Sequence, residues 1–269
     1  MVRIVLRNVI KASGESERFD KNKLMRTMMR AGVDNRTAAS IAIIAEKKFP
    51  DNTATHDIYK FVMDEIEKKS SEAASVFGLR EAIADLDSVS FEKYAMKILE
   101  SNGYNCIWNK IVDGRCIDHQ IDIIGKKDDK VFYIECKRHY NPHRFCGLEV
   151  PLEVWARLID MQEGFADRKN KYDFSKAWIF TNSKFSMHAM KYAGAKDIIM
   201  TGWSMSLQEL IEKNKIYPVT ILNIDISVKT ELLKNDIITL QDVLGAKRIK
   251  IDGWNNIVEM ARKTLGKKY

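Results

Sequence analysis

Two acidic residues and a lysine occur at a spacing that suits metal-assisted hydrolysis. Asp122 lies in a predicted strand, Cys116 to Ile124, and Glu135 and Lys137 lie in the next one, Val131 to Lys137. Because side chains alternate between the faces of a strand, Glu135 and Lys137 share a face, and Asp122 can project beside them from the neighbouring strand. Carboxylate oxygens bind Mg²⁺, which keeps bound waters, and one such water can become an attacking hydroxide. The lysine can orient or deprotonate that water.

The strand that carries Asp122 has one polar and one apolar face. Asp118 and Gln120 share the polar face with Asp122. The opposite face is expected to carry the core isoleucines Ile117, Ile121 and Ile123. An exposed strand whose acid and lysine merely pair with a neighbour has the same Glu-x-Lys spacing. The spacing alone therefore leaves a catalytic and a structural interpretation open.

The elements that must position these residues alternate as they do in α/β domains. A helix whose apolar face runs from Phe91 to Leu99 ends at Asn102-Gly103, and Pro151 can begin a later helix. Strands are expected at residues 104–112, 116–124, 131–137, 177–180 and 197–200, with a charged turn at 125–130 and a short helix at 187–193. Together these segments predict a mixed sheet flanked by helices.

Several short motifs in this segment match a known family. They are Phe91-Glu92, Gly103-Tyr104, Ile121 to Ile124, Tyr133 to Lys137, Thr181-Asn182-Ser183, Phe185, Ala189, Lys191 to Ala193 and Thr201-Gly202-Trp203. On these residues the segment, nearly all of 91–204, resembles the type IV restriction endonuclease (Mrr-like) branch of the PD-(D/E)xK nuclease superfamily. The resemblance implies divalent-metal-dependent cleavage of DNA. Asp122, Glu135 and the Cys136 backbone carbonyl would bind Mg²⁺ or Mn²⁺, and Lys137 would be the catalytic base or stabiliser.

Other polar residues near this motif are open to two interpretations. Glu92 matches an acid that can complete the metal shell in the superfamily, but a helix dipole also favours an acid in the first turns. His139 and His143 either contact phosphate or bases, or are ordinary loop histidines. Gln162 either reaches the site or is solvated. Related chains often have a glutamate where Gln120 stands, so one additional acid is absent here.

The first ninety residues predict a small hairpin followed by helices. The hairpin is expected over residues 4–19, with its turn at Ser13-Gly14. Asp20 can cap the first helix, and Thr55 or Asp57 can cap a later one. We expect a sheet of two to three strands and about four helices.

Motifs in this N-terminal segment match a second family. They are Val9 to Lys11, Gly14, Glu17 to Asp20, Lys23-Leu24, Thr55 to Ile58 and Gly78 to Arg80. On these residues the segment, residues 3–86, resembles the ATP-cone, a regulatory nucleotide-binding domain of ribonucleotide reductases. The resemblance implies that Lys11, Glu17, Lys23 and Thr55 contact ATP or dATP. The family's Lys-Arg-Asp-Gly is here Lys-Ala-Ser-Gly at residues 11–14, so one phosphate-binding cation is missing. The alternative is that these lysines are ordinary surface residues.

The last segment, residues 216–269, repeats a short helix-turn pattern and resembles a helix-hairpin-helix region. Such motifs bind the DNA backbone through a glycine turn that exposes amides to phosphate. Asp225-Ile226 occupies the first turn in place of glycine, whereas Gly253 supplies one in the second. The segment therefore either docks on DNA, aided by Lys247, Arg248 and Lys250, or is a structural helical cap.

Composition excludes several classes of protein. The chain has 269 residues, of which 45% are hydrophobic and 30% charged, with only 4 prolines, and this excludes collagen-like, low-complexity and largely disordered chains. The net charge is a modest +7. No uncharged apolar run approaches the ~18 residues of a membrane span, and the four cysteines form no CxxC pair. We expect free thiols, a cytoplasmic location and no membrane partner.

These observations together predict an α/β protein (α+β overall) in three parts. Residues 1–88 are expected to be an ATP-cone, 89–212 a restriction-endonuclease-like domain and 213–269 a helical region. The expected function is Mg²⁺-dependent cleavage of double-stranded DNA, regulated by ATP or dATP or by nucleotide-driven assembly into a homodimer or higher homo-oligomer. Two alternatives stay open. One is a nucleotide-sensing DNA-binding regulator with an inactive nuclease fold, and the other is a structure-specific repair nuclease.

Overall fold

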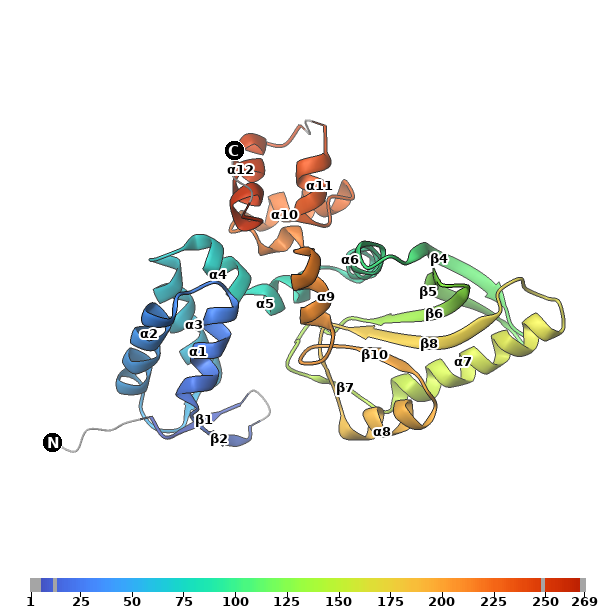
Figure 1. Ribbon diagram of the computed structural model, residues 1–269, viewed down its shortest axis with the longest axis horizontal. Helices are drawn as coiled ribbons and strands as arrows, with labels where there is room; N and C mark the ends of the chain where they lie inside the picture. The colour runs from blue at the N-terminus through green and yellow to red at the C-terminus, as the bar shows by residue number, and fades with distance from the viewer. Residues whose placement is uncertain (1–5, 12–13, 248–249, 267–269) are drawn as a thin grey trace. The chain divides into compact units, whose positions relative to one another are not determined.

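The computed structural model describes residues 6–11, 14–247 and 250–266 (Figure 1). The chain forms two compact units. The first contains the segment up to Ala82, residues 221–224 and the chain from Lys247 on, and the second contains Ile83–Thr220 and Asp225–Ala246. Among the described residues, no helix combines the length and the apolar character that crossing a membrane requires.

The first unit has a three-stranded sheet beside a group of helices. β1 (Asn8–Ile10) pairs antiparallel with β2 (Ser16–Arg18) and parallel with β3 (Thr53–Ala54). The helices are α1 (Lys21–Arg30), α2 (Asn35–Lys48), α3 (Thr55–Glu67), α4 (Ser71–Phe77) and α12 (Trp254–Thr264), and α12 packs on α4. α5 (Leu79–Ala84) follows α4. The predicted hairpin and helices are therefore present.

Two predicted caps in the first unit have different outcomes. The Asp20 side chain accepts the Lys23 backbone N–H at 3.0 Å, so Asp20 caps α1 as expected. The expected cap at Thr55 or Asp57 is wrong. The N-cap of α3 is Ala54, without a side-chain hydrogen bond, because β3 runs directly into the helix.

The second unit is built on a five-stranded mixed sheet of order β10-β8-β6-β5-β4. β4 (Asn105–Asp113), β5 (Asp118–Lys127) and β6 (Lys130–Lys137) are antiparallel, and β8 (Phe174–Thr181) and β10 (Ile199–Thr201) continue in parallel from β6. A separate two-stranded sheet pairs β7 (Phe145–Cys146) with β9 (Lys184–Phe185). The predicted mixed sheet flanked by helices is confirmed.

Helices cover both faces of the large sheet. Neighbouring residues of β8 point to opposite faces of the sheet. Ile179 lies in the core that is covered by α7 (Glu149–Ala166) and α8 (Met187–Ala195). On the other face, the Phe180 ring contacts Phe91 of α6 (Ser88–Ser101). Figure 1 shows α7 running along the strands, on the side away from α6. The expected end of α6 at Asn102-Gly103 is confirmed, with Gly103 at φ 87°.

Three details of the second unit differ from the sequence prediction. Ile117 is 63% exposed, because it lies in the turn before β5 and not in the strand. The turn after β5 is limited to Asp128 and Asp129, both with positive φ, so β5 extends to Lys127. Such a two-residue turn matches the twist of a hairpin. α7 begins at Glu149, which leaves Pro151 inside its first turn.

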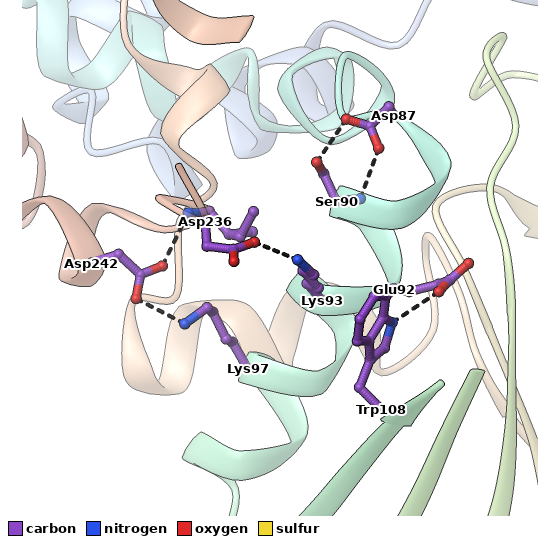
Figure 2. A network of polar contacts seen from close by, with 9 residues as sticks. Asp87, Ser90, Glu92, Lys93, Lys97, Trp108, Asp236 and Asp242 are labelled. Atoms are coloured by element: carbon purple, nitrogen blue, oxygen red, sulfur yellow. Dashed lines mark hydrogen bonds and ion pairs between the residues drawn. The ribbon is translucent and has the colours of Figure 1, made fainter. Parts of the chain in front are cut away.

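The remaining helices follow the sheet. They are α9 (Leu207–Asn214), a 3₁₀ turn (Val219–Ile221), α10 (Ile226–Lys234) and α11 (Leu240–Gly245). Ion pairs join this segment to α6: Lys97 contacts Asp242 at 2.8 Å, and Lys93 contacts Asp236 (Figure 2). Part of the C-terminal region is thus packed against a helix of the large sheet.

Candidate active site

The two carboxylates singled out in the sequence lie where two strands separate. The pairing of β5 with β6 ends at Ile123 and Ile134. Beyond this point β5 continues beside β4, and β6 continues beside β8. Asp122 and Glu135 are the next residues on the two strands. We call this place the fork.

A side chain replaces the missing backbone pairing at the fork. The backbone N–H of Cys136 donates to Oδ2 of Asp122 at 2.7 Å. This bond places Asp122 directly beside the Glu135-Cys136 backbone of the neighbouring strand. The structure thus brings Asp122 and Glu135 to one point of the sheet, on adjacent strands.

Glu135 is held by two donors that reach the same oxygen. The Tyr133 hydroxyl donates to Oε2 at 2.8 Å, and Nη1 of Arg157, on α7, donates to Oε2 at 2.7 Å. The Arg157 guanidinium also lies over the Tyr133 ring, 5.3 Å from its centroid. Within the part of the chain that the structure describes, Oε1 of Glu135 and Oδ1 of Asp122 receive no hydrogen bond. Each carboxylate therefore keeps one oxygen available.

Burial makes the ionised carboxylates costly. Burial is the main cause that raises the pKa of Asp122 to about 6, with Glu92 adding repulsion and the Cys136 amide opposing the shift. Burial followed by repulsion from Asp122 raises the pKa of Glu135 to about 7, although Arg157 opposes it. Burial also raises the pKa of Glu92. Like charges gathered in a desolvated place favour either a proton or a bound cation.

Glu92 has a partner of its own. It accepts the indole N–H of Trp108 at 3.0 Å, and Lys93 lies over the same indole, 4.7 Å from the ring centroid (Figure 2). In the described ranges, no three His, Cys, Asp or Glu side chains gather closely enough to enclose a metal ion by themselves. A metal at the fork would therefore rest on Asp122, Glu135 and backbone or water oxygens, and a role for Glu92 as a further ligand stays a prediction.

Lys137 is exposed and lies two residues after Glu135, at the end of β6. Its carbonyl accepts the Thr181 hydroxyl at 2.6 Å, which fixes the strand end to β8. The loop that follows is fixed by Asn182, whose amide accepts the His139 backbone N–H and donates to the His139 carbonyl, both at 2.8 Å. His139 is half-buried and His143 is exposed.

Two residues of α7 make contacts that differ from those expected from the sequence. Gln162 donates to the Phe174 carbonyl at 2.7 Å and is thus tied to β8, so neither proposed interpretation of it, at the site or solvated, holds. Arg157, which the sequence analysis did not single out, reaches Glu135 instead. The sequence did hold a signal for this contact, namely an arginine one position before the buried Leu158. A cation beside the apolar face of a helix needs an acidic partner.

Three candidate nucleotide ligands of the first unit also lie together. Glu17 pairs with Lys11 at 2.9 Å and with Lys23 at 3.0 Å, and these hydrogen bonds hold the pKa of Glu17 below its ordinary value. Ile10 and Ala54 are paired on parallel strands, so the residues that follow them, Lys11 and Thr55, leave the same edge of the sheet. Ala12 and Ser13, where the family motif departs, lie outside the described residues.

The C-terminal candidates are only partly described. Lys247 and Lys250 are described, whereas Arg248 is not. Gly253 is the N-cap of α12 and has φ 73°, a conformation that glycine adopts without strain.

Comparisons with known proteins identify a domain of this chain. Residues 83–204 match the Mrr catalytic-domain family, described as restriction endonuclease. An uncharacterized protein of Archaeoglobus fulgidus is 35% identical over 173 residues, which span 63% of this chain and 94% of that protein. The crystal structure of a protein of unknown function is 31% identical, with a TM-score of 0.56, and covers 66% of this chain and 99% of its own.

A second structure is more distant. Can2 from Sulfobacillus thermosulfidooxidans, in complex with cyclic tetra-adenylate, is 14% identical with a TM-score of 0.34, covering 74% of this chain and 64% of that one. At that score the likeness supports no inference. The chain and the Archaeoglobus protein belong to one family. Residues 83–204 are a restriction endonuclease-like domain of the PD-(D/E)xK superfamily. This domain supports the assignment of the protein as a nuclease.

Proposed function

We propose that the protein is a metal-dependent endonuclease that hydrolyses phosphodiester bonds of double-stranded DNA. The observation that carries this proposal is the fork, where two half-buried carboxylates with raised pKa values each keep one oxygen available. A divalent cation suits such a pair, because it neutralises both charges and accepts hard oxygen ligands. Asp122, Glu135 and the Cys136 carbonyl would hold it.

Each residue of the fork has a separate task in this mechanism. A bound Mg²⁺ or Mn²⁺ would polarise the phosphate and lower the pKa of a bound water. The Cys136 amide orients Asp122, and the Tyr133 hydroxyl orients Glu135. Lys137, exposed at the end of β6, orients the attacking water or stabilises the charge that develops on the phosphate. Its ammonium, with three donors, suits either task.

Cleavage of supercoiled plasmid tests the proposal. Wild type should nick or linearise it with Mg²⁺ and leave it intact with EDTA. Lys137→Ala should lower the cleavage rate at least about 100-fold while DNA affinity changes little, since affinity comes mostly from phosphate contacts spread over the surface. Lys130→Ala, an exposed lysine at the start of the same strand, is the matched control and should cleave like wild type.

Two results would contradict the proposal. DNA binding without cleavage under any divalent metal would favour a regulator with an inactive nuclease fold. Cleavage confined to branched or gapped DNA would favour a repair nuclease. Equal rates for Lys137→Ala and wild type would remove that residue from the mechanism.

We further propose that the first unit binds ATP or dATP as an effector. The arrangement of Lys11, Glu17 and Lys23 supports this, because two ammonium groups already face one carboxylate and could exchange it for a phosphate. Calorimetry with ATP, dATP and ADP should show binding that Lys11→Ala weakens and that Lys47→Ala, an exposed lysine of α2, does not. Light scattering of the same samples tests whether nucleotide drives homo-oligomer formation. No heat with any nucleotide would contradict an effector site.

The three-part organisation is part of the same proposal. Residues 1–88 would sense nucleotide, 89–212 would cleave, and 213–269 would add backbone contacts to DNA. Changing Lys247 and Lys250 together to alanine should weaken DNA binding about equally for unrelated sequences and make it less sensitive to salt. Unchanged affinity would leave the C-terminal region as a structural cap.

A further inference from the structure

One side chain spans the fork from the helix that covers it. Nη1 of Arg157 donates to Oε2 of Glu135 on β6 at 2.7 Å, and Nη2 donates to the backbone carbonyl of Gln120 on β5. Both strands are thus bonded to one rigid guanidinium. The Arg157 side chain is only 18% exposed, and its plane lies over the Tyr133 ring.

This bridge lies where the sheet has no backbone bonds between the two strands. The β5–β6 pairing ends at Ile123 and Ile134, one position before the two carboxylates. Without a cross-link, the separation between Asp122 and Glu135 would depend on the Cys136–Asp122 bond alone. The guanidinium adds a second cross-link, because its five N–H groups have a fixed planar geometry.

Arg157 also determines which oxygen of Glu135 remains available. Arg157 and Tyr133 both bond to Oε2. Oε1 of Glu135 is then the oxygen that would be left to hold a cation. The helix that carries Arg157 therefore selects the direction from which Glu135 can bind a cation.

We propose that Arg157 is a positioning residue that holds Asp122 and Glu135 at the separation of a single divalent cation, and that it leaves Glu135 one oxygen for that cation. The inference rests on the proposed function, since it assigns a metal to the fork. It predicts that loss of the guanidinium shape, and not only of the charge, weakens metal binding. Replacing a residue that orients metal ligands typically changes metal affinity by about 10- to 100-fold.

Mn²⁺ binding to the whole protein, followed by calorimetry, tests the inference without relying on cleavage. Arg157→Met and Arg157→Lys should both bind Mn²⁺ at least about 10-fold more weakly than wild type. A lysine keeps the charge, but one ammonium cannot reproduce the planar pair of bonds to Glu135 and Gln120. Tyr133→Phe, which removes the other donor to Oε2, should weaken binding less. In cleavage assays, Arg157→Lys should lower kcat and raise the Mn²⁺ requirement, with KM for DNA unchanged.

Arg115→Met is the matched control, because Arg115 also pairs with acids, Glu163 of α7 and Asp167 at the end of that helix, but is 58% exposed and outside the fork. It should bind Mn²⁺ like wild type. Thermal unfolding in EDTA shows whether each variant folds, and Arg157→Lys and Tyr133→Phe keep the test usable if Arg157→Met does not.

The outcomes separate this inference from the proposed function. Wild-type Mn²⁺ affinity in Arg157→Lys would overturn the positioning role, and tighter binding in Arg157→Met would make Arg157 a competitor of the metal. Weakened Mn²⁺ binding in both variants of a protein that does not cleave DNA would support the positioning role and contradict the nuclease function. No Mn²⁺ binding by wild type would overturn both.

Discussion

The backbone amide of Cys136 and the carboxylate of Asp122 are joined across the fork by a hydrogen bond of 2.7 Å. A half-buried acid beside other acids is thereby held in place by a main-chain donor. The bond needs only an acceptor oxygen, whereas catalysis as proposed needs the negative charge. Structure and function therefore depend on different properties of one side chain.

Asp122→Asn should separate these two properties. The amide keeps an oxygen for the Cys136 N–H but removes the charge. Because the folded-state pKa of Asp122 is raised to about 6, the ionised form destabilises the fold at pH 7, and this cost disappears as the pH falls below the ordinary aspartate range. Without metal at pH 7, the variant should gain about 1–2 kcal/mol of unfolding free energy and lose cleavage. Urea unfolding in EDTA measures the first effect. Lower stability than wild type would contradict the charge argument.

Gly164 should be intolerant of alanine although it lies inside α7. Alanine normally stabilises a helix interior by about 1 kcal/mol relative to glycine. A Cβ at Gly164 would lie 2.7 Å from the Asp113 carbonyl oxygen and 2.7 Å from the Gly114 carbonyl carbon, and backbone cannot move aside like a side chain. We therefore expect Gly164→Ala to lower the unfolding free energy by about 1–3 kcal/mol, as overpacking does.

Gly194 of α8 is the matched control, because a Cβ there meets nothing within 4 Å. Gly194→Ala should raise the unfolding free energy by roughly 0.5–1 kcal/mol. Thermal unfolding of the two variants should thus shift in opposite directions. Equal shifts would mean that α7 does not approach the β4–β5 turn as closely as described.

Asp160 of α7 organises the start of β5. Its carboxylate accepts the Cys116 N–H at 2.8 Å and lies 2.8 Å from Nε2 of the buried His119. The hydrogen bonds to these groups outweigh the opposing effect of burial and lower the pKa of Asp160 well below its ordinary value. Such a depressed pKa contributes stability above the unfolded-state pKa near 4, and this contribution is lost as the pH falls further.

Asp160→Asn should therefore lower the unfolding free energy by roughly 1–3 kcal/mol at pH 7 and by less at pH 3. Urea unfolding at both pH values measures the difference. Asp173→Asn, an exposed residue before β8, is the control and should change little. A larger loss at pH 3 than at pH 7 would contradict this linkage, since the folded carboxylate gives up its charge only at still lower pH.

Replacing Asp242 should cost much more stability than replacing Lys97, although the two residues form one ion pair. Lys97 contributes one contact at 2.8 Å between partly exposed groups, which is typically worth less than about 1 kcal/mol. Asp242 also accepts the backbone N–H groups of Thr239 and Ile238 and completes the capping box of α11. We expect Asp242→Ala to lose about 1–2 kcal/mol and Lys97→Met less than half of that. Equal losses in thermal unfolding would assign the effect to the ion pair and not to the cap.

Local sequence patterns were sufficient to predict the five strands of the large sheet and the shared face of Glu135 and Lys137. Alternation placed Glu135 and Lys137 on one side of β6, and Asn102-Gly103 was recognised as the end of α6. These features depend on residues that are neighbours in the chain. The roles of Asp122, Glu135 and Lys137 remain predictions.

Only the tertiary structure determined how the fork is held together. The separation of β5 from β6 depends on their different partners, β4 and β8, and β8 lies some forty residues further along the chain. Arg157 and Gln162 are both polar residues of α7, but the packing of that helix turns Arg157 toward Glu135 and Gln162 toward the Phe174 carbonyl. Ile117 is exposed because Asp160, 43 residues later, binds the backbone of its turn. Sequence spacing describes contacts along one element, whereas these contacts depend on which elements pack together.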